Sequence, residues 1–493
     1  MTEPHVLAVD QGTGSTKALL LNAAGAVVSR AQAPLAQSHP GPGLVEQDAA
    51  ALLAGVRTAV ADCLRDTDPR AVAGVALSTQ RESVVLWEAA TGQPVAPLVG
   101  WQDQRGTDRA DRLVRAGADE EIRRRTGLPL DPMFSALKMA ALLDAHDPAR
   151  TRSRTGALRL GTVDAYLLHT LTGSPLTETG NASRTQLLDL ATGDWDDELL
   201  ALFDVPRAAL SRIVPSTGPF PALRGLHPLT DGTPMLAVLG DSHAALFAHA
   251  GWRPGTVKAT YGTGSSVMTT AASPAPADRV CTTIAWSTGR PAYAHEANVR
   301  STGRTLTWLA DLLGTSPEEL IGAAAGADAG DVTLVPAFGG VGAPWWDARA
   351  VPVLAGFGLE TGRAQLARAA LESVAFQVAD VLAALPDARQ VVADGGLSRS
   401  DALMQLQADV SGVPVARTPQ HELSAAGAAH LAGLGLGLWT TGDLERRADR
   451  DLRTHTPDWD DARRADALAR WHRRLGAARD LGTRARPRTP RQP

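Results

Sequence analysis

Cysteine is almost absent from this chain of 493 residues, which contains only Cys63 and Cys281. The two positions lie far apart and form no Cys-x-x-Cys pair, so they can build neither a disulfide framework nor a cysteine zinc site. Scarce and unpaired cysteines are typical of proteins that work in a reducing compartment. The sequence therefore predicts a cytoplasmic protein.

Long apolar runs and an excess of positive charge are also missing. No uninterrupted run approaches the roughly 18 apolar residues of a membrane-spanning helix, and the first residues show no basic stretch before an apolar segment. The chain has 48 Lys and Arg against 53 Asp and Glu, which gives a net charge of −5. No uniformly basic field is left for nucleic acid or an anionic membrane. We therefore expect neither as a partner.

Aromatic residues and lysine are few. Aromatic side chains make up 4% of the chain, so Ala, Val and Leu must fill the hydrophobic cores. Lysine occurs only at Lys17, Lys138 and Lys258, and all other basic residues are arginine. In so arginine-rich a chain, these three positions are candidates for a specific role.

A strand, a glycine-rich turn and a second strand are predicted over residues 6–22. The same succession recurs over 257–270, and both turns contain the tetrapeptide Gly-Thr-Gly-Ser, at 12–15 and 262–265. A repeat separated by half the chain predicts two related domains rather than a short-period solenoid. Because strands alternate with helices along the chain, the pattern indicates an α/β fold.

The boundary between the two domains is expected after a strand at 234–241 and a helix at 242–250, where Gly251-Trp-Arg-Pro-Gly255 breaks the pattern. In the second half, a strand at 390–394 and a turn at Gly395-Gly396 precede a helix that we expect to begin at Ser398, capped by serine. The expected division is 1–248 for the N-terminal domain, 249–480 for the C-terminal domain and 481–493 for a disordered, Pro- and Arg-rich tail.

The first glycine-rich turn fits neither of two common phosphate-binding patterns. A Walker loop needs glycine where Thr16 stands, and a dinucleotide fingerprint needs its third glycine where Lys17 stands. The turn is still suited to phosphate, because small residues let backbone N–H groups approach an anion, while hydroxyls and Lys17 add donors and charge. A purely structural hairpin remains the alternative for either turn. Two such turns facing each other across a cleft would hold the two ends of a triphosphate.

Asp10 and Asp241 each stand at the end of a predicted strand, where α/β sheets place their ligands. A carboxylate beside a triphosphate can hold Mg²⁺ or accept a proton from an attacking hydroxyl. The alternative is a helix N-cap, which is open for Asp241 because a helix follows it.

Other motifs lack the partners that their chemistry needs. Ser135-Ala-Leu-Lys138 has the Ser-x-x-Lys spacing, but no Lys-Thr-Gly accompanies it. His421-Glu422 lacks the second histidine of a zinc helix, and His243 and His249 are not one helical turn apart. The sequence therefore predicts no histidine metal cage.

Short motifs in a familiar order run along nearly the whole chain. They are Asp10-Gln-Gly-Thr13, Gly43-Leu-Val-Glu-Gln-Asp48, Thr79-Gln-Arg-Glu82, Trp101-Gln, Asp131-Pro, Phe134-Ser135, Gly161-Thr-Val-Asp164, Asn181-Ala-Ser-Arg-Thr185, Gly240-Asp241, Thr260-Tyr-Gly-Thr-Gly264, Gly342-Ala-Pro, Leu371-Glu-Ser and Asp394-Gly-Gly396. With them the chain resembles the FGGY family of carbohydrate kinases, and within that family it is most similar to glycerol kinases. Many ordered matches are far more specific than any single one.

The resemblance implies two actin-like (ribonuclease H-like) ATPase domains that flank a cleft. It also implies ATP-dependent phosphorylation of a primary hydroxyl of a small polyol or sugar, with ATP and Mg²⁺ as cofactors. The N-terminal domain would hold the substrate and the C-terminal domain would hold ATP. A homodimer and a homotetramer both stay open for the assembly.

The resemblance also assigns residues by position. Asp241 would be the general base, and Asp10 the acid associated with the metal. The substrate-binding residues would be Arg81, Glu82, Trp101, Met133, Asp241, Ser242 and Ser266. The nucleotide-binding residues would be Gln11, Gly12, Thr13, Gly14, Ser15, Lys17, Gly262, Thr263, Gly303, Gly396 and Ser400.

Three of these positions depart from glycerol kinases, which usually carry Tyr at the place of Met133, Gln at Ser242 and often an aromatic at Ser266. Two of the three changes shorten the side chain, which predicts a larger pocket and favours a tetritol, a pentitol or a ketopentose over glycerol. Asp103 adds an acid that resembles the Trp-x-Asp-x-Arg run of pentulose kinases.

Two alternatives remain open. Within the enzyme class the alternative is a xylulose-type ketopentose kinase, which Asp103 favours and Thr79-Gln-Arg-Glu82 does not. From another class, the alternative is a non-catalytic actin-fold protein that binds ATP and changes shape. The residues of the substrate pocket argue against it, because a nucleotide switch needs no sugar site.

Overall fold

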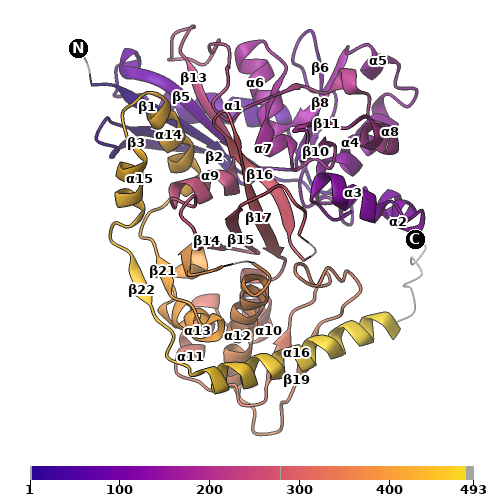
Figure 1. The fold of residues 1–493 in the computed structure, drawn as a ribbon, viewed down its shortest axis with the longest axis vertical. Helices are drawn as coiled ribbons and strands as arrows, with labels where there is room; N and C mark the ends of the chain where they lie inside the picture. Colours follow the sequence, from indigo (N-terminus) through magenta and orange to yellow (C-terminus); the bar gives the residue numbers. More distant parts are fainter. Residues whose placement is uncertain (1–2, 278, 386, 485–493) are drawn as a thin grey trace.

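The computed structural model describes residues 3–277, 279–385 and 387–484, which form two halves stacked along the long axis of the molecule (Figure 1). The first half is built on a sheet with the strand order β13-β5-β1-β2-β3. Its strands are β1 (His5–Gln11), β2 (Ser15–Leu21), β3 (Val27–Pro34), β5 (Val72–Thr79) and β13 (Met235–Gly240). β1, β5 and β13 are parallel, whereas β1 pairs antiparallel with β2, and β2 with β3.

The second half is built on a sheet with the order β16-β17-β15-β14-β20-β21-β22. Its strands are β14 (Thr256–Tyr261), β15 (Ser265–Ala271), β16 (Cys281–Ser287), β17 (Pro291–Val299), β20 (Gln390–Asp394), β21 (Val415–Arg417) and β22 (Arg453–His455). β14 pairs antiparallel with β15 and parallel with β20, as β1 does with β2 and β5. The repeated tetrapeptide therefore marks a repeated topology, and the predicted α/β fold with two domains is confirmed.

Smaller strands and the helices surround the two sheets. A further sheet in the first half has the order β4-β7-β6-β8, and the remaining strands form three pairs. The strand bounds are β4 (Glu46–Gln47), β6 (Val84–Glu88), β7 (Leu98–Val99), β8 (Leu158–Thr162), β9 (Leu176–Glu178), β10 (Leu188–Asp189), β11 (Asp194–Trp195), β12 (Arg212–Val214), β18 (Thr333–Val335) and β19 (Val353–Ala355). The helix bounds are α1 (Ala49–Cys63), α2 (Thr107–Arg115), α3 (Asp119–Thr126), α4 (Ser135–His146), α5 (Thr151–Arg154), α6 (Val163–Thr172), α7 (Thr179–Ala182), α8 (Asp197–Phe203), α9 (Asp241–Ala248), α10 (Gly303–Leu312), α11 (Pro317–Ala325), α12 (Arg363–Leu382), α13 (Asp401–Ser411), α14 (Leu423–Gly435), α15 (Thr441–Ala448) and α16 (Asp461–Arg484).

β1 shows why the first sheet is covered on both faces. Leu7 and Val9 belong to a core shared with α1 and α6, whereas Val6 and Ala8 belong to a core shared with α9 and α14. Alternate side chains of a strand point to opposite faces, so a continuous apolar run predicts a strand that is buried on both sides. The polar residues at the strand end are thereby left at the edge of the sheet.

In the second sheet the two faces of β14 differ. Val257, Ala259 and Tyr261 belong to the core that α10 to α13 and α16 build beneath the sheet. Lys258 and Thr260, which alternate with them, line a cavity on the opposite side. One face of the strand therefore holds the domain together, and the other faces the space between the two halves.

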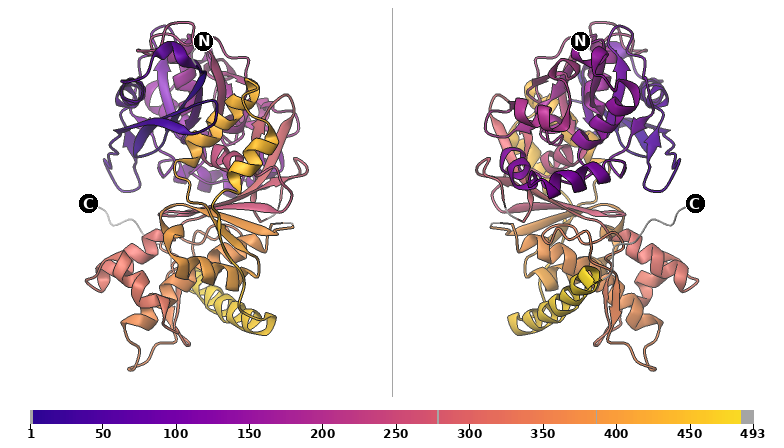
Figure 2. Two further views of the ribbon diagram at one scale, coloured as in Figure 1. Left: turned by 90° about the vertical axis from the view of Figure 1, so that its left-hand side faces the viewer. Right: turned by 90° about the vertical axis from the view of Figure 1, so that its right-hand side faces the viewer.

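The chain returns to the first half near its end. α14 packs against α9 and against β1, β5 and β13, and the gold segment that contains α14 and α15 lies among the indigo and magenta elements of the upper half (Figures 1 and 2). The expected ranges 1–248 and 249–480 thus divide the sequence, but residues 423–448 pack with the first sheet. Two helices from the end of the chain complete the core of the first half.

Two details of the second half differ from expectation. Ser398 lies in a short 3₁₀ turn, and the cap of α13 is Ser400, whose hydroxyl accepts a hydrogen bond from the N–H of Leu403. Residues 481–484, expected in a disordered tail, are the last turn of α16, because Gly482 is buried against the backbone of Arg349. The rest of that predicted tail, 485–493, lies outside the described residues.

α16 has 24 residues. Neither it nor any other helix within the described ranges has an apolar stretch long enough to cross a membrane.

The contact between α14 and α9 can be tested at Gly427. A Cβ atom there would lie 1.8 Å from the carbonyl oxygen of Ala244, an atom that cannot move without moving α9. We expect Gly427→Ala to lower the free energy of unfolding by about 1–3 kcal/mol, because overpacking forces the helices apart. Gly435→Ala in the same helix meets no atom within 4 Å and serves as the control in chemical denaturation. Equal stability of the two variants would contradict the close packing.

Candidate active site

A cavity of about 890 Å³ opens between the two sheets, at the carboxyl ends of their parallel strands. Its lining includes Asp10 at the end of β1, Asp241 directly after β13 and Asp394 at the end of β20. Lys17 and Lys258 also line it, so two of the three lysines face this space. The cavity therefore combines carboxylates and ammonium groups in the place where α/β sheets bind ligands.

A second cavity of about 960 Å³ lies in the lower half and shares Gly396 and Arg399 with the first. Five predicted nucleotide residues line it, namely Gly262, Thr263, Gly303, Gly396 and Ser400. The start of α10 and the apolar side chains of Trp308 and Ile321 form other parts of its wall. Two joined cavities, one charged and one partly apolar, suit a molecule with a polyanionic end and a flat organic end.

The first hairpin turn is placed differently from the second. Gln11 ends β1, Gly12, Thr13 and Gly14 form the turn, and Ser15 begins β2. None of these five residues lines either cavity. The turn is held by Gln47, whose Nε2 donates to the carbonyl oxygen of Thr13 at 2.7 Å. The indole N–H of Trp101 donates to the Thr13 hydroxyl at 3.1 Å. The turn therefore lies against the predicted substrate side, and phosphate binding by it stays a prediction.

Asp10 and Asp241 form a pair of carboxylates in the first cavity. Burial, followed by the charge of Asp241, raises the pKa of Asp10 to about 7, although Ser78 donates a hydrogen bond to it at 2.9 Å. Burial likewise raises the pKa of Asp241, and the nearby guanidinium of Arg81 opposes that shift. The two acids are thus poised to take a proton or a cation.

The N-cap alternative for Asp241 is wrong, since the cap of α9 is Gly240 and no side chain caps the helix. Oδ1 of Asp241 instead accepts a hydrogen bond from the N–H of Ser242 at 2.6 Å. The side chain of Asp241 is 35% exposed. Its carboxylate is therefore held in place and still reachable from the cavity.

A magnesium ion fits this donor set only together with a ligand. Among the described residues no group of three or more His, Cys, Asp and Glu side chains could enclose a metal. Mg²⁺, however, is usually bound by one or two carboxylates, with phosphate oxygens and water as the other ligands. Asp10, with its raised pKa and its place in the cavity, suits a cation that arrives with a phosphate.

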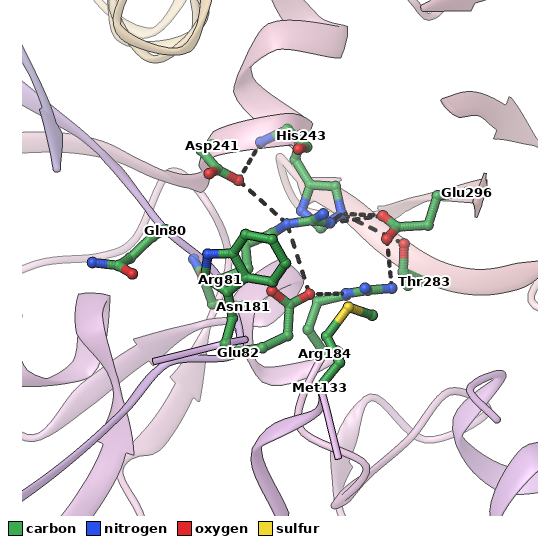
Figure 3. Close-up of polar contacts among 12 residues, drawn as sticks. Gln80, Arg81, Glu82, Met133, Asn181, Arg184, Asp241, His243, Thr283 and Glu296 are labelled. Carbon is green, nitrogen blue, oxygen red and sulfur yellow. Dashed lines mark hydrogen bonds and ion pairs between the residues drawn. The ribbon is translucent and has the colours of Figure 1, made fainter. Parts of the chain in front are cut away.

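Behind Asp241 lies a buried cluster of charges (Figure 3). Nη1 of Arg81 donates to Oε2 of Glu296 at 2.7 Å and to Nε2 of His243 at 3.2 Å. Arg184 pairs with Glu82 and with Glu296, each at 2.6 Å. Burial opposes the charge of Arg81, but Glu296, Glu82 and Asp241 together raise its pKa above its ordinary value. The cluster stays ionised because each charge has a partner.

Some polar atoms of this cluster have no hydrogen-bond partner within the described part of the chain, and Nε of Arg81 is one of them. This buried Nε makes ion pairs with Oδ1 of Asp241 at 3.4 Å and with Oε1 of Glu82 at 3.9 Å, but neither contact is a hydrogen bond. A buried N–H without a partner is unfavourable unless a ligand completes it. The position between two carboxylates suits a hydroxyl group, which accepts from the guanidinium and donates to an acid.

The other predicted substrate residues lie around this cluster. Sδ of Met133 accepts a hydrogen bond from Nδ2 of Asn298 at 3.7 Å. Asn298 is paired across the sheet with Ser266, whose hydroxyl is buried without a partner in the described residues. Ser242 lines the first cavity. The structure thus brings side chains from both halves of the sequence to the same region.

Asp103 is not free to bind a ligand. Its Oδ1 accepts from the backbone N–H and from Nε of Arg105, and its Oδ2 accepts from the N–H of Val45 at 2.7 Å. The side chain is fully buried. Its carboxylate therefore braces the loop after β7, and it gives no support to a pentulose-type substrate contact.

Arg184, His243, Glu296, Lys258 and Trp308 are site residues that the sequence analysis did not assign. The scarcity of lysine pointed to Lys258, and Arg184 lies inside the motif at 181–185. His243 was considered only as a metal ligand, whereas burial lowers its pKa to about 4 and its Nε2 accepts from Arg81. Nothing in the local pattern around Glu296 or Trp308 distinguishes them from ordinary strand and helix residues.

Sequence models of a known family match most of the chain. The N-terminal domain of the FGGY family of carbohydrate kinases matches residues 5–248, and the C-terminal domain of the same family matches residues 257–436. The N-terminal match therefore corresponds to the first half of the fold, and the C-terminal match follows it along the chain.

Individual relatives agree over nearly full length. A glycerol kinase from Aromatoleum aromaticum is 43% identical, with 96% of this chain and 99% of the relative covered. An apulose kinase from Pectobacterium atrosepticum is 38% identical, with 97% and 99% covered.

Solved structures share the fold. The glycerol kinase of Plasmodium falciparum with ADP superposes with a TM-score of 0.91 at 24% identity, covering 97% of this chain and 98% of that one. The xylulose kinase of Rhodospirillum rubrum gives a TM-score of 0.83 at 28% identity, with the same coverage.

The charge cluster predicts a large effect of Glu296→Gln. Without this carboxylate, Arg81 and Arg184 lose a shared countercharge in a buried site, so we expect the free energy of unfolding to fall by about 3–5 kcal/mol in denaturation at pH 7. The exposed variant Glu120→Gln is the control, with an expected change of less than about 0.5 kcal/mol.

The same variant has a defined pH dependence. The guanidinium groups hold the pKa of Glu296 well below its ordinary value of 4.5. Its contribution is therefore complete above that value and is lost as the pH falls through the lower folded-state pKa. The difference between wild type and Glu296→Gln should shrink in acid. A difference that grew in acid would show that Glu296 is not held ionised.

Proposed function

The chain belongs to the FGGY family of carbohydrate kinases, and from that premise we propose that Asp241 activates a primary hydroxyl of an acceptor larger than glycerol. The protein is an ATP-dependent phosphotransferase whose acceptor is a polyol or sugar. The observation that carries the proposal is the position of Asp241, which lines the charged cavity and lies 3.4 Å from Nε of Arg81, an atom without a hydrogen-bond partner in the described residues.

In the proposed mechanism the acceptor is held by the Arg81 cluster. Nε of Arg81 donates to one hydroxyl, and Glu82 accepts from that hydroxyl or its neighbour. Asp241 then accepts the proton of the primary hydroxyl as that oxygen bonds to the γ-phosphorus, while the bond from the γ-phosphorus to the β,γ-bridging oxygen breaks and ADP leaves. A pKa raised by burial makes Asp241 a stronger base than a free carboxylate. Because phosphoryl transfer needs mainly alignment, a rigid cluster is well suited to it.

The nucleotide would extend through the two joined cavities, with its phosphates in the charged one and its base near Trp308. Lys17 and Lys258 line the charged cavity and would balance the phosphate charge. Asp10 would hold Mg²⁺ together with the nucleotide phosphates. This ion, when bound, would neutralise charge on the transferred group. Gly262, Thr263 and Gly303 are proposed to contact the nucleotide through their backbone, because they line the second cavity.

The proposed acceptor has four or five carbons. Ser242 and Ser266 have small side chains. The thioether side chain of Met133 is more flexible than the ring of a tyrosine would be. The apulose kinase is 38% identical to this chain, within the range of 37% to 43% that several glycerol kinases show. Overall similarity therefore does not decide between a polyol and a ketose, and both belong in the test.

We further propose a cytoplasmic location, since Cys63 and Cys281 are both free and buried. Assembly as a homodimer or a homotetramer stays a prediction.

The role of Asp241 is tested with Asp241→Asn. With Mg-ATP and a panel of glycerol, tetritols, pentitols and ketopentoses, we expect acceptor-dependent ADP release in the wild type. The variant should retain acceptor binding and lose about 10²- to 10⁴-fold in kcat, because the general base is missing. Asp66→Asn, at an exposed position, is the control. Turnover at the wild-type level in Asp241→Asn would contradict the assignment of Asp241 as the general base. ADP release without any acceptor would indicate a nucleotide switch.

The size of the acceptor pocket is tested with the double variant Met133→Tyr, Ser242→Gln. Both changes restore the residues usual in glycerol kinases, so kcat/KM for glycerol should rise relative to that for four- and five-carbon acceptors. The effect of filling such a pocket is about 10-fold or more in the ratio. The KM for ATP is the internal control and should stay unchanged. An unaltered preference order would show that these positions do not set acceptor size.

A further inference from the structure

The Ser-x-x-Lys motif at the start of α4 lies beside the proposed acceptor site. Ser135 and Lys138 are both completely buried. They stand one helical turn apart, so both side chains lie on the same side of α4. Glu82 and Met133, two of the proposed acceptor-binding residues, accept hydrogen bonds at their carbonyl oxygens from this side of the helix.

Lys138 holds the segment that carries Met133. Its ammonium group donates to the carbonyl oxygens of Pro132 and Phe134, each at 3.0 Å, and also to that of Met133. An ammonium group has three hydrogens, and here each has a carbonyl acceptor from three consecutive residues. No other side-chain type offers three donors from one small centre, which explains a lysine here in a chain that uses arginine at all but three of its Lys and Arg positions.

Ser135 holds Glu82. Its hydroxyl donates to the carbonyl oxygen of Glu82 at 3.0 Å. Glu82 has a positive φ of 62°, a conformation that is unfavourable for a residue with a side chain and persists only where its surroundings enforce it. The bond from Ser135 is one such restraint, and it keeps the Glu82 carboxylate next to Arg81 and Arg184.

The segment at 131–134 also joins the two halves of the sequence. Asp131 pairs with Arg300 at 2.6 Å, and the Met133 thioether accepts from Asn298. Both partners come from the strand β17 and the residue after it. A shift of this segment would therefore move Met133 relative to the second sheet.

We propose that Ser135 and Lys138 are positioning residues that set acceptor affinity and preference by fixing Glu82 and Met133. The inference rests on the proposed function, because it concerns the same acceptor site. Neither residue touches the reacting atoms. Their effect reaches the acceptor through two backbone segments, the one at Glu82 and the one at 132–134.

The test uses Ser135→Ala and Lys138→Met in the full chain. ADP release is measured first as the acceptor concentration is varied and then as the ATP concentration is varied. We expect the KM for the preferred acceptor to rise about 5- to 50-fold in each variant, because one or more buried hydrogen bonds are lost. The KM for ATP should stay within about twofold, and kcat should change much less than the acceptor KM. The preference for larger acceptors over glycerol should narrow in Lys138→Met, since Met133 is released.

Ser153→Ala is the matched control for Ser135→Ala. Ser153 is a fully buried serine in α5 whose hydroxyl donates to Asp147 at 2.8 Å, away from the acceptor cluster. This variant should lose stability without a change in acceptor KM. The contrast separates a positioning role from a purely structural one.

The outcomes are distinguishable. An unchanged acceptor KM in both variants, or an equal rise in Ser153→Ala, would overturn the inference while leaving the kinase intact. If Lys138→Met does not fold, Ser135→Ala decides alone. If the wild type shows no acceptor-dependent turnover with any compound of the panel, the proposed acceptor site and this inference fall together.

Discussion

The acceptor side of this molecule depends on one buried charge, the guanidinium of Arg81. A desolvated cation is tolerated only where anions surround it, and Arg81 meets Asp241, Glu82 and Glu296 from three different parts of the chain. The partners come from the start of α9, the turn between β5 and β6, and the strand β17. Because the charge cannot lose them without a large penalty, it holds these elements in one arrangement. Nε of Arg81 has no hydrogen-bond partner among the described residues and lies 3.4 Å from Oδ1 of Asp241.

The arrangement of the two sheets explains which residues each half contributes to the cleft. The two sheets repeat one topology, so the carboxyl ends of their central strands meet across one cleft. Asp10 and Asp241 come from the first sheet, and Lys258 and Asp394 from the second. α14 returns from the end of the sequence to cover the first sheet, which ties the two halves together outside the cleft. A cleft between two linked bodies can close around its ligands and exclude water, which a kinase needs to avoid hydrolysing ATP.

Much of the site could be predicted from short patterns. Asp10 and Asp241 follow apolar strands, and the two Gly-Thr-Gly-Ser turns identify the hairpins, because these features are local in sequence. Arg184, His243 and Glu296 could not be assigned in this way, since each depends on partners more than 100 residues away. Asp103 was misleading for the same reason: as a sequence feature it resembles a substrate contact, but the fold uses both of its oxygens for Arg105 and Val45.

By itself the sequence determined the α/β fold, the internal duplication, the family and the chemistry of phosphoryl transfer, because these depend on periodicity and on motifs of a few residues. Only the tertiary structure decided which charges neutralise one another, which buried hydroxyls and N–H groups lack a partner among the described residues, and that Ser135 and Lys138 bind the backbone of Glu82 and of residues 132–134. The reason is physical. The energy of a charge or of a hydrogen-bonding group depends on its burial and on its neighbours in space, and those neighbours come from distant parts of the chain.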